Sequence, residues 1–542
     1  MKKTLIYLLV TLMLLASSCE KIPTVPSVSP FVEQESVLTQ QGIDTAAPPA
    51  DPTIFDRGNG KAKISGISLM SEKAGLLDGC TFSVTDDNII TLAYPLVASD
   101  KDVSAAKLVI ESDGRITDRT YDLREPNYIN VYDENGERST YLLMAERIKY
   151  PIPLMQIYTD GEAEIKTKTE YVHSKLIIDG VEYQMKIKGR GNASWNVFPK
   201  KSYRIKLDDG ASLFGLTKNR DFTLTSNYAD KSLIRNSVAH TIAATLDGLD
   251  FTSVHIPVNL YLNGEYLGVY TFSDKIEEGE GRLDFTAIEG DEPNTFWKWR
   301  DLGFLCEVGW DFDSENIYNQ DYFDAEKVLR IYVKEPESDE PNTPEFSYAK
   351  QYILATEKAI VENDGWEGLI DLDSWVDWFI VTEFTFNTES AFYRSCYFWK
   401  REGGKLMLGP VWDFDMAFGN HWGDIRGYGG WCTTESTYQY ITENWMNFLI
   451  TYDTFNDAVK ERWNEKKEDL LDTALSAIES YSTMLDGSEQ QNFTVWDIMD
   501  KQIGDAFVSP YLYRTYESQI EYLRKFVIDR YEYMDKRINE EF

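Results

Sequence analysis

Past the middle of its length the chain reads Gly409-Pro-Val-Trp-Asp-Phe-Asp-Met-Ala-Phe-Gly419, which places two carboxylates among aromatic side chains. Moving ionised carboxylates out of water is costly unless a cation or hydrogen-bond donors replace the solvent. A hard cation such as Mg²⁺ prefers oxygen ligands and can bridge to phosphate. The segment therefore predicts a metal site at Asp413 and Asp415. The alternative is that these residues cap a helix or form the turn around Gly419.

Another carboxylate, Glu389, lies upstream of this segment. Aromatic residues at helical spacing, among them Trp375 and Trp378, predict a helix before it, and the apolar run Cys396-Tyr-Phe-Trp399 predicts a strand after it. Kinase-like folds place a base and their metal ligands in this order, with a carboxylate after a helix, then a hairpin, then an aspartate that precedes Phe. The order makes Glu389 a candidate for the base.

A glycine turn with basic flanks occurs earlier, in Lys188-Gly-Arg-Gly-Asn-Ala-Ser-Trp195. Gly189 and Gly191 allow the backbone to approach a ligand closely, and a lysine on the following strand would neutralise phosphate charge. An ordinary glycine turn explains the same residues, so the turn indicates a ligand site only together with its neighbours.

The following strand is expected within Pro199-Lys-Lys-Ser-Tyr-Arg-Ile-Lys-Leu207. Side chains alternate between the two faces of a strand. Lys201 would then share the inward, apolar face with Tyr203, and Lys200, Arg204 and Lys206 would share the other face. Because a lysine on an apolar face needs a partner, we predict that Lys201 contacts the ligand and that Lys206 is solvated.

Two local patterns fix the middle of the chain. Asn263-Gly264 lies between two alternating apolar runs, and this is the strongest short-range signal of a β-hairpin. Before it, Ile234, Val238 and Ile242 repeat at helical spacing in the predicted helix 231–246, with Asp230 as its expected cap.

The larger organisation follows from composition and spacing. Residues 59–148 hold short apolar runs separated by turn clusters, which predicts a small β-sandwich. Strand-rich sequence from about 149 to 300 and helix-rich sequence from about 301 to 542 predict an α+β unit with two lobes.

Four segments resemble, in this order, the spore-coat CotH kinase family. They are Arg190-Gly-Asn-Ala-Ser-Trp with Pro199-Lys-Lys-Ser-Tyr-Arg-Ile-Lys-Leu207, Asn227-Tyr-Ala-Asp-Lys-Ser-Leu-Ile-Arg-Asn236, Tyr261-Leu-Asn-Gly-Glu-Tyr-Leu-Gly-Val-Tyr270, and Gly409-Pro-Val-Trp-Asp-Phe-Asp-Met-Ala-Phe-Gly419. The resemblance implies a bilobal atypical protein-kinase-like fold over residues 149–542, with a helical C-terminal lobe.

The resemblance also implies an activity, ATP-dependent transfer of phosphate to Ser or Thr of a secreted or cell-surface protein with Mg²⁺ or Mn²⁺. It implies that Lys201 contacts ATP phosphate beside Gly189, Arg190 and Gly191. Asp413 would take the metal-binding role of the kinase Asp-Phe-Gly aspartate. Glu389 stands where the family commonly has Asp and would orient the acceptor hydroxyl. A kinase-style partner for the lysine would have to be Asp230 or Glu307, because the interior of the predicted helix 231–246 has no acidic residue.

The rival interpretation is a surface lipoprotein that keeps the fold, has little or no catalytic activity, and binds a glycan or protein. Its candidate contacts are aromatic residues in the loop after Gly419, namely Trp422, Tyr428 and Trp431. The four histidines and the remaining cysteines show no metal-binding spacing, so ordinary satisfied or solvated side chains are expected.

The N-terminus has the features of an export signal. A cationic start and an apolar run end at Ala16-Ser-Ser-Cys19, which predicts a signal peptide for Sec export over residues 1–19, with Cys19 lipidated. A Pro-rich tether is expected over residues 20–58, so any membrane attachment would be by lipid, at the cell envelope. The formal net charge of −36 argues against nucleic acid as a partner.

The anchor can be tested directly. We expect Cys19→Ser to move the protein from the membrane fraction to the soluble fraction, because the acceptor for the lipid would be lost. Immunoblots of the two fractions measure the change. Membrane fractionation that still requires detergent in this variant would contradict a lipid on Cys19.

Overall fold

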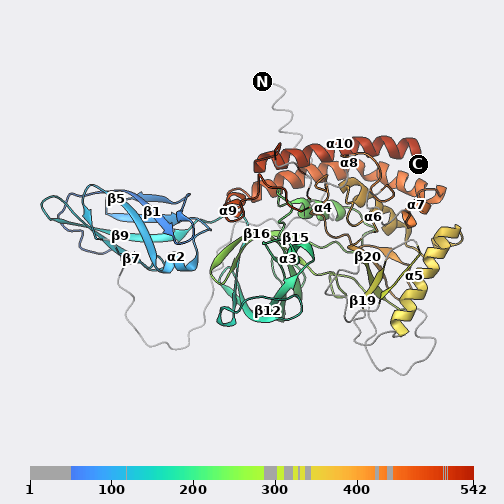
Figure 1. Ribbon diagram of the computed structural model, residues 1–542, viewed down its shortest axis with the longest axis horizontal. Coiled ribbons are helices and arrows are strands. Elements are labelled where there is room, and N and C mark those ends of the chain that lie inside the picture. The colour runs from blue at the N-terminus through green and yellow to red at the C-terminus, as the bar shows by residue number, and fades with distance from the viewer. Residues whose placement is uncertain are drawn as a thin grey trace, which may run out of the picture.

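The computed structural model shows a two-sheet unit, a closed β-barrel and a larger, mainly helical part (Figure 1). It describes residues 51–117, 119–285, 302–309, 322–326, 330–335, 344–392, 394–421, 427–435, 443–504, 506, 508 and 511–542. Helical content is 29% and strand content 30%, which confirms the predicted α+β class. The signal segment with Cys19, and the tether up to residue 50, lie outside the described residues.

The first part consists of two sheets around one core. One sheet has the order β2-β1-β5-β7 and the other β3-β4-β9-β8-β6. The elements are β1 (Ile64–Ser71), β2 (Gly75–Leu76), β3 (Thr81–Val84), β4 (Ile89–Tyr94), α2 (Asp100–Ser104), β5 (Ala106–Ser112), β6 (Arg115–Ile116), β7 (Thr120–Tyr121), β8 (Asn127–Tyr132) and β9 (Arg138–Arg147). Alternate residues such as Ile90 and Leu92 enter the core, because side chains alternate along a strand. Residues 51–58, expected to belong to the tether, contact this unit instead, since Gly58 bridges to Ser139.

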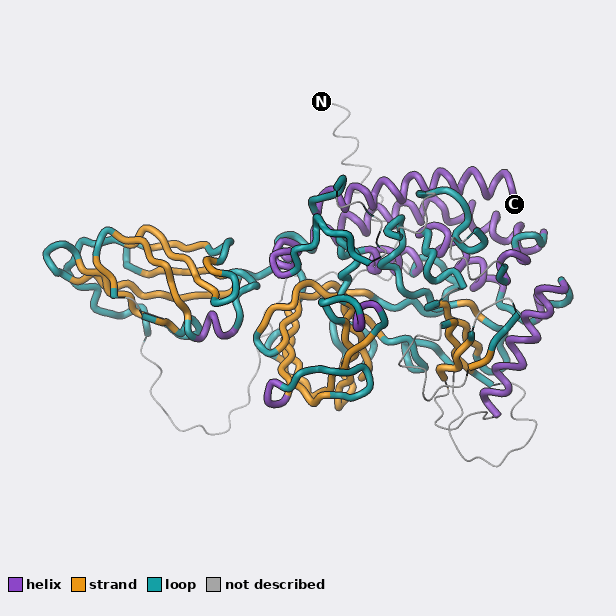
Figure 2. Tube along the Cα trace, in the orientation of Figure 1, coloured by secondary structure: helices purple, strands orange, loops and turns teal. Residues whose placement is uncertain are grey.

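Seven strands then close into a barrel, in the order β10-β11-β12-β13-β14-β16-β15 (Figure 2). They are β10 (Leu154–Thr159), β11 (Val172–Ile178), β12 (Val181–Arg190), β13 (Ser202–Ala211), β14 (Asn219–Thr225), β15 (His255–Leu262) and β16 (Glu265–Asp274), with the short helices η1 (Asp160–Glu162) and α3 (Ala193–Asn196) between strands. The parallel pairing of β10 with β15 closes the ring. Buried residues including Ile187, Ile205 and Leu224 form the barrel core. Closure depends on long-range pairing and was not predicted from the sequence.

The predicted hairpin is confirmed by β15 and β16. Asn263 and Gly264 have φ values of 50° and 77°, as a two-residue turn with left-handed backbone requires. Tyr261, at the end of β15, also joins the barrel to the first part. Its hydroxyl donates to the carbonyl oxygens of Leu96 and Ala98.

The predicted helix 231–246 is shorter in the structure, where α4 spans Arg235–Ala243. Its predicted apolar face, which includes Val238 and Ile242, is fully buried. The carboxylate of Asp230 accepts hydrogen bonds from the backbone N–H groups of Ser232 and Arg235, which shapes a turn before the helix. Asp230 therefore holds the helix start without occupying the N-cap position.

The third part contains a five-stranded sheet in addition to the helices expected there. Its order is β18-β19-β17-β20-β21. The strands are β17 (Phe304–Val308), β18 (Tyr322–Phe323), β19 (Ile331–Glu335), β20 (Cys396–Lys400) and β21 (Met407–Leu408). The predicted strand at 396–399 is confirmed as β20. The others are short runs separated by long connections, so their periodicity is weak in the sequence.

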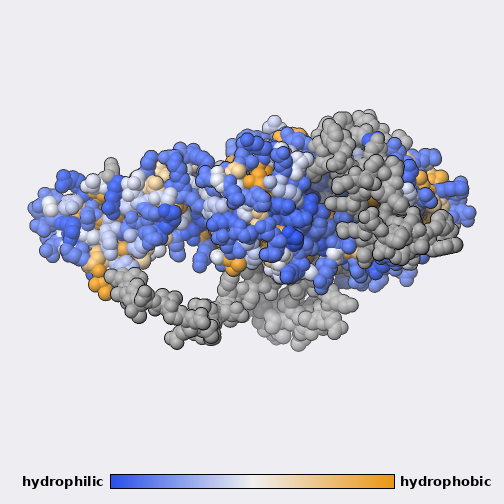
Figure 3. Space-filling model, turned by 90° about the horizontal axis from the view of Figure 1, so that it is seen from below, coloured by the Kyte–Doolittle hydropathy of each residue, from blue (hydrophilic) through white to orange (hydrophobic). Residues whose placement is uncertain are grey.

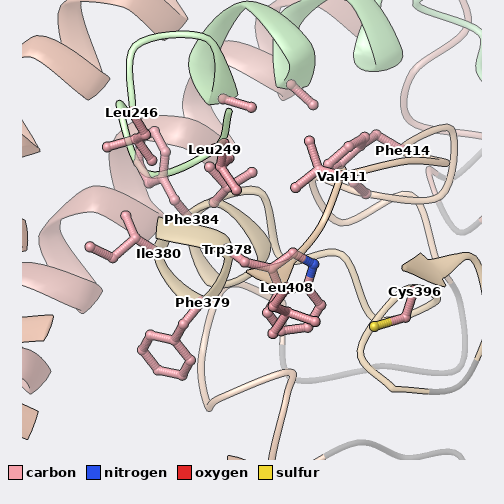
Figure 4. Close-up of a cluster of buried hydrophobic side chains, with 14 of the residues drawn as sticks. Leu246, Leu249, Trp378, Phe379, Ile380, Phe384, Cys396, Leu408, Val411 and Phe414 are labelled. Carbon is pink, nitrogen blue, oxygen red and sulfur yellow. The ribbon is translucent and has the colours of Figure 1, made fainter. Parts of the chain in front are cut away.

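Helices cover this sheet and α4. They are α5 (Pro344–Glu362), η3 (Trp366–Gly368), α6 (Leu372–Thr385), α7 (Trp445–Leu449), α8 (Asp453–Met484), α9 (Ser488–Val495) and α10 (Tyr516–Glu541). Helix α6 lies at the centre, and its residues Trp378, Phe379 and Phe384 pack with Leu249 and Val411 in a common core (Figure 4). The helix predicted from Trp375 and Trp378 is therefore confirmed.

A buried ion pair fixes α10 to α6. The guanidinium of Arg530 donates to a carboxylate oxygen of Glu383 at 2.8 Å, and both side chains have zero exposure. Arg530 also donates to the carbonyl oxygens of Tyr428 and Gly430, while Glu383 accepts from the backbone N–H groups of Cys432 and Thr433. The pair thus anchors the segment 427–435 as well.

The surface is mostly hydrophilic on the face in Figure 3, in keeping with the high net charge. Within the part of the chain that the structure describes, no helix has the length and apolar character needed to cross a bilayer.

The buried pair leads to a stability prediction. We expect Glu383→Gln to lower the free energy of unfolding by about 3–5 kcal/mol, because it leaves the Arg530 charge buried without its partner. The matched control is Glu479→Gln, which removes the exposed partner of Arg524 and should cost at most about 1 kcal/mol. Urea unfolding followed by far-UV circular dichroism compares the two variants. Equal losses would contradict a special role for the buried pair.

Candidate active site

A cavity of about 520 Å³ lies between the outer face of the barrel and the third part of the molecule. The barrel contributes the end of β12, the adjoining glycine turn and Arg204. The segment 225–229 forms another wall. Facing these are Glu307, Glu389 and the segment 412–416. The cavity therefore brings together segments that are far apart in the sequence.

Three carboxylates meet in this cavity. Glu389, Asp413 and Asp415 each offer an oxygen atom, and these atoms all lie within 4.8 Å of one another. No other group of this kind occurs among the described residues. Carboxylate oxygens are the ligands that Mg²⁺ and Mn²⁺ take in proteins. The cluster predicted from the sequence is thus assembled in the fold with a donor set that suits a hard divalent cation.

The backbone turn at Asp413 is held from several sides. Asp413 has φ = 67°, in the left-handed region that favours glycine, although Asp tolerates it better than most residues. Asn387 donates its side-chain N–H to the Asp413 carbonyl at 3.0 Å, and Ser395 donates its hydroxyl to the Asp413 carboxylate at 3.1 Å. The next residue, Phe414, donates its backbone N–H to the side-chain oxygen of Asn236 at 2.8 Å. These bonds aim the Asp413 carboxylate into the cavity.

The close carboxylates alter the titration of Asp415. Burial, followed by the negative charges of Asp413 and Glu389, raises the pKa of Asp415 well above its ordinary value. A cation placed between the carboxylates would reverse this effect, because it favours the ionised form. The cluster is therefore costly as a set of free charges and fits a cation-binding role.

Glu389 also has a cationic neighbour. Its carboxylate lies 3.2 Å from the guanidinium of Arg394, which follows it on the same connection between α6 and β20. Glu389 has 14% side-chain exposure and Arg394 34%, so the pair sits at the mouth of the cavity and not in the protein core. The position allows Glu389 to contact both a bound cation and an incoming group.

Cationic side chains on the barrel face the same cavity. Lys188, Arg190 and Arg204 all line it. Lys188 lies opposite Arg204 on the neighbouring strand, and such like-charge neighbours repel unless anions lie between them. Arg204 is paired with Asp221 at 2.7 Å, and the guanidinium of Arg190 lies over the ring of Trp412 at 5.0 Å. This face of the barrel is suited to phosphate oxygens.

The structure does not bring Lys201 into this cavity, in contrast to the sequence prediction. The ammonium of Lys201 donates to the Trp195 carbonyl at 2.5 Å. Strand β13 begins only at Ser202, so the alternation that we extended back to Lys201 does not apply there. The face that we expected to be solvated carries Arg204, which lines the cavity, and Lys206, which pairs with Asp221.

Lys200, immediately before Lys201, is the fully buried lysine of this segment. It donates to the Val269 carbonyl at 2.6 Å and to the Asn492 side chain at 2.8 Å. Burial lowers the pKa of Lys200 well below its ordinary value. Its role is to link the barrel to α9.

The glycine turn is placed at the cavity as predicted. Gly189, Arg190 and Gly191 all line it. A Cβ atom at Gly189 would lie 2.5 Å from the ring of Trp195, so this glycine is needed for local packing. Gly191 has φ = 89°, which favours glycine on conformational grounds. Both explanations considered for the turn, packing and ligand approach, are compatible with this geometry.

We expected Asp230 or Glu307 to pair with Lys201, but the lysine that pairs with Glu307 in the cavity is Lys334. Glu307 on β17 lies 3.2 Å from Lys334 on β19, and both residues line the cavity. Asp230, the other candidate, is fully buried with Arg235. Lys334 was missed because its strand has only a weak sequence signal and its neighbour across the sheet is distant in sequence.

Two other sequence expectations can be assessed. Trp431, a candidate glycan contact, is only 3% exposed and belongs to the core, whereas Tyr428 is 44% exposed and Trp422 lies outside the described residues. The expectation that the histidines are satisfied or solvated is wrong for His255. Its ring is buried and stacked on His240, and neither of its nitrogens has a hydrogen-bond partner within the part of the chain that the structure describes.

An acidic cluster that suits a divalent cation is opposed by cationic side chains across one cavity, an arrangement that suits a phosphate-bearing ligand. A comparison with protein families matches residues 187–534 to the family described as CotH kinase protein. The match covers more than half of the chain, and the chain belongs to this family. A search of curated proteins finds no match.

The acidic cluster gives a prediction with a definite sign. Because the pKa of Asp415 is raised in the folded state, the native protein holds this proton more tightly than the unfolded chain does. Stability from this group is therefore lost as the pH rises above about 4 towards the raised pKa. We expect Asp415→Asn to remove this loss, so that without divalent cations the variant melts above the wild type at neutral pH.

The same melting experiment tests metal binding. Mg²⁺ or Mn²⁺ should raise the melting temperature of the wild type, since a ligand of the native state stabilises it, and Asp413→Asn should abolish the rise. Asp208→Asn, which neutralises an exposed carboxylate, is the control and should behave as the wild type. An equal metal effect in Asp413→Asn would place the cation elsewhere.

Proposed function

We propose that this protein is a CotH-type phosphotransferase that transfers the γ-phosphoryl group of ATP to Ser or Thr of a secreted or cell-surface protein. The observation that carries the proposal is the single cavity in which Glu389, Asp413 and Asp415 face Lys188 and Arg190. In this proposal the barrel is the N-terminal lobe of a bilobal kinase-like fold, and the third part is its C-terminal lobe. The family membership supports a kinase-type function in general terms.

Each group has a role that its chemistry supports. Asp413 and Asp415 would hold Mg²⁺ or Mn²⁺, which would supply charge neutralisation for the phosphate oxygens. Lys188 and Arg190 bind phosphate oxygens by charge-assisted hydrogen bonds. Glu389 orients the acceptor hydroxyl and takes its proton as the new P–O bond forms and the bond to ADP breaks.

Glu389 stands where the family commonly has Asp. Its additional methylene moves the carboxylate by about 1.5 Å, and a misplacement of about 1 Å can cost on the order of 10²-fold in rate. Arg394 is the neighbour that adjusts this longer arm, because it pairs with the Glu389 carboxylate at 3.2 Å. We propose that the surrounding loop is matched to Glu.

We further propose that the protein works at the cell envelope, attached by a lipid on Cys19, and that its acceptor is a protein there. The acidic charge supports an acceptor with basic or neutral surroundings and gives no support to nucleic acid as a partner. The alternative of a glycan-binding surface protein loses one of its candidate contacts, because Trp431 is buried.

The transfer can be measured with γ-labelled ATP, Mg²⁺ or Mn²⁺, and envelope extract. We expect label on Ser or Thr with the wild type, and a loss of about 10²-fold or more in Asp413→Ala and Glu389→Ala, because these variants remove a metal ligand and the orienting carboxylate. If the loop is matched to Glu, Glu389→Asp also lowers the rate.

The matched control is Asp208→Ala, which removes an exposed carboxylate outside the cavity and should keep full activity. Phosphoamino-acid analysis identifies the acceptor side chain. A wild-type chain that binds no ATP at millimolar concentration, or label transfer that survives in Asp413→Ala, would refute the phosphotransferase proposal.

A further inference from the structure

A second cavity, of about 1100 Å³, lies where the connection between the two-sheet unit and the barrel meets α4 and the end of α8. Its walls come from residues 147–154, 214–216 and 252–257, together with these two helices. The volume lies just above the range of small-molecule sites, about 300–1,000 Å³. The only residue that it shares with the lining of the first cavity is His255, which lies in both walls.

Most of the lining is apolar. Ile148, Ile152, Leu154, Phe214, Leu216 and Met484 contribute side chains to it. These residues come from three separate segments, so the apolar surface exists only in the folded chain. A cavity of this kind does not favour charged ligands that lack an apolar part, because such ligands bury no apolar surface against its lining.

A few polar atoms within this lining have no partner. The hydroxyl of Thr252, the Nε of Arg147 and both ring nitrogens of His255 are buried and make no hydrogen bond among the described residues. His255 is only 4% exposed. Buried polar atoms in native proteins are nearly always paired, so an unpaired group in a cavity wall marks where a ligand atom would bind.

The chemistry of these groups defines the polar end of the ligand. Arg147 Nε offers an N–H donor, and another nitrogen of the same guanidinium pairs with Asp100 at 3.5 Å. The Thr252 hydroxyl can donate or accept. Burial lowers the pKa of His255 well below its ordinary value, so its neutral ring offers one donor and one acceptor. Lys149 adds a second cation to the lining, against a single acid, Asp179. Two cationic side chains against one acidic side chain in the lining favour a carbonyl or carboxylate.

We propose that this second cavity binds a small molecule with an acyl chain and a carbonyl or carboxylate end. The chain packs against the apolar lining, and the polar end accepts hydrogen bonds from Thr252 and Arg147. This binding is separate from the proposed phosphotransfer and requires neither ATP nor a metal.

The full chain should be titrated with decanoate and with methyl decanoate by isothermal titration calorimetry, without nucleotide. We expect saturable binding of one molecule per chain. Tighter binding of decanoate identifies a free carboxylate as the preferred end, and tighter binding of the ester identifies an acyl ester, because the two probes share the same chain.

Two variants locate the binding. Ala244→Trp, at the C-cap of α4, fills the cavity and should abolish binding. Thr252→Val keeps the shape of the side chain but removes the hydroxyl, and it should weaken binding about three- to tenfold, the equivalent of one hydrogen bond. The control Thr494→Val makes the same change on the exposed face of α9 and should bind as the wild type.

Loss of binding in Ala244→Trp together with weaker binding in Thr252→Val supports the proposal. Thr252→Val keeps the proposal testable even if the larger substitution Ala244→Trp prevents folding. Absence of binding to the wild type at millimolar concentration would overturn it. An unchanged affinity in Thr252→Val would also overturn the proposal, because the polar end of the ligand would then make no hydrogen bond with the Thr252 hydroxyl.

Discussion

The turn at Asp413 is the constraint on which the arrangement of the site depends. Two asparagines hold it from different elements, Asn236 on α4 through the backbone of Phe414 and Asn387 after α6 through the Asp413 carbonyl. A non-glycine residue in the left-handed region costs on the order of 1–3 kcal/mol, and it persists only where its surroundings enforce it. The large core around α6 holds the turn in this conformation. The packing of the aromatic side chains therefore also determines the direction of the Asp413 carboxylate.

Much of the local structure could be predicted from the sequence. The hairpin at Asn263-Gly264 is encoded by two adjacent residues, and the buried faces of α4 and α6 by helical periodicity, so neither needs information from distant parts of the chain. The two faces of β13 were assigned correctly, because Tyr203 and Ile205 are buried and Arg204 is not. The ligand was placed on the wrong face, because the cavity lies against the outer face of the barrel, and the packing partner of that face cannot be read from strand alternation.

The acidic half of the site could also be predicted from the sequence. Carboxylates within an aromatic segment lose solvation energy wherever the segment is buried, so they need a cation or hydrogen-bond donors. In the cationic half, Arg190 was predicted and lines the cavity, but Lys201 does not, and Arg204 and Lys334 were not predicted. Arg204 faces the cavity because the barrel closes and turns that face towards the third part of the molecule, and Lys334 reaches the cavity from a short strand that pairs with a distant one. Both placements depend on long-range contacts that leave no periodic signal.

Closure of the barrel also limits how a protein partner can be recognised. A sheet with an open edge can capture an extended peptide by adding it as another strand, with the main chain supplying the affinity. The seven barrel strands pair in a ring and offer no such edge. A polypeptide that reaches the cavity therefore cannot add to the barrel as another strand. On the barrel side it would be bound through side chains and loops at the cavity mouth, and those loops would determine which partner is selected.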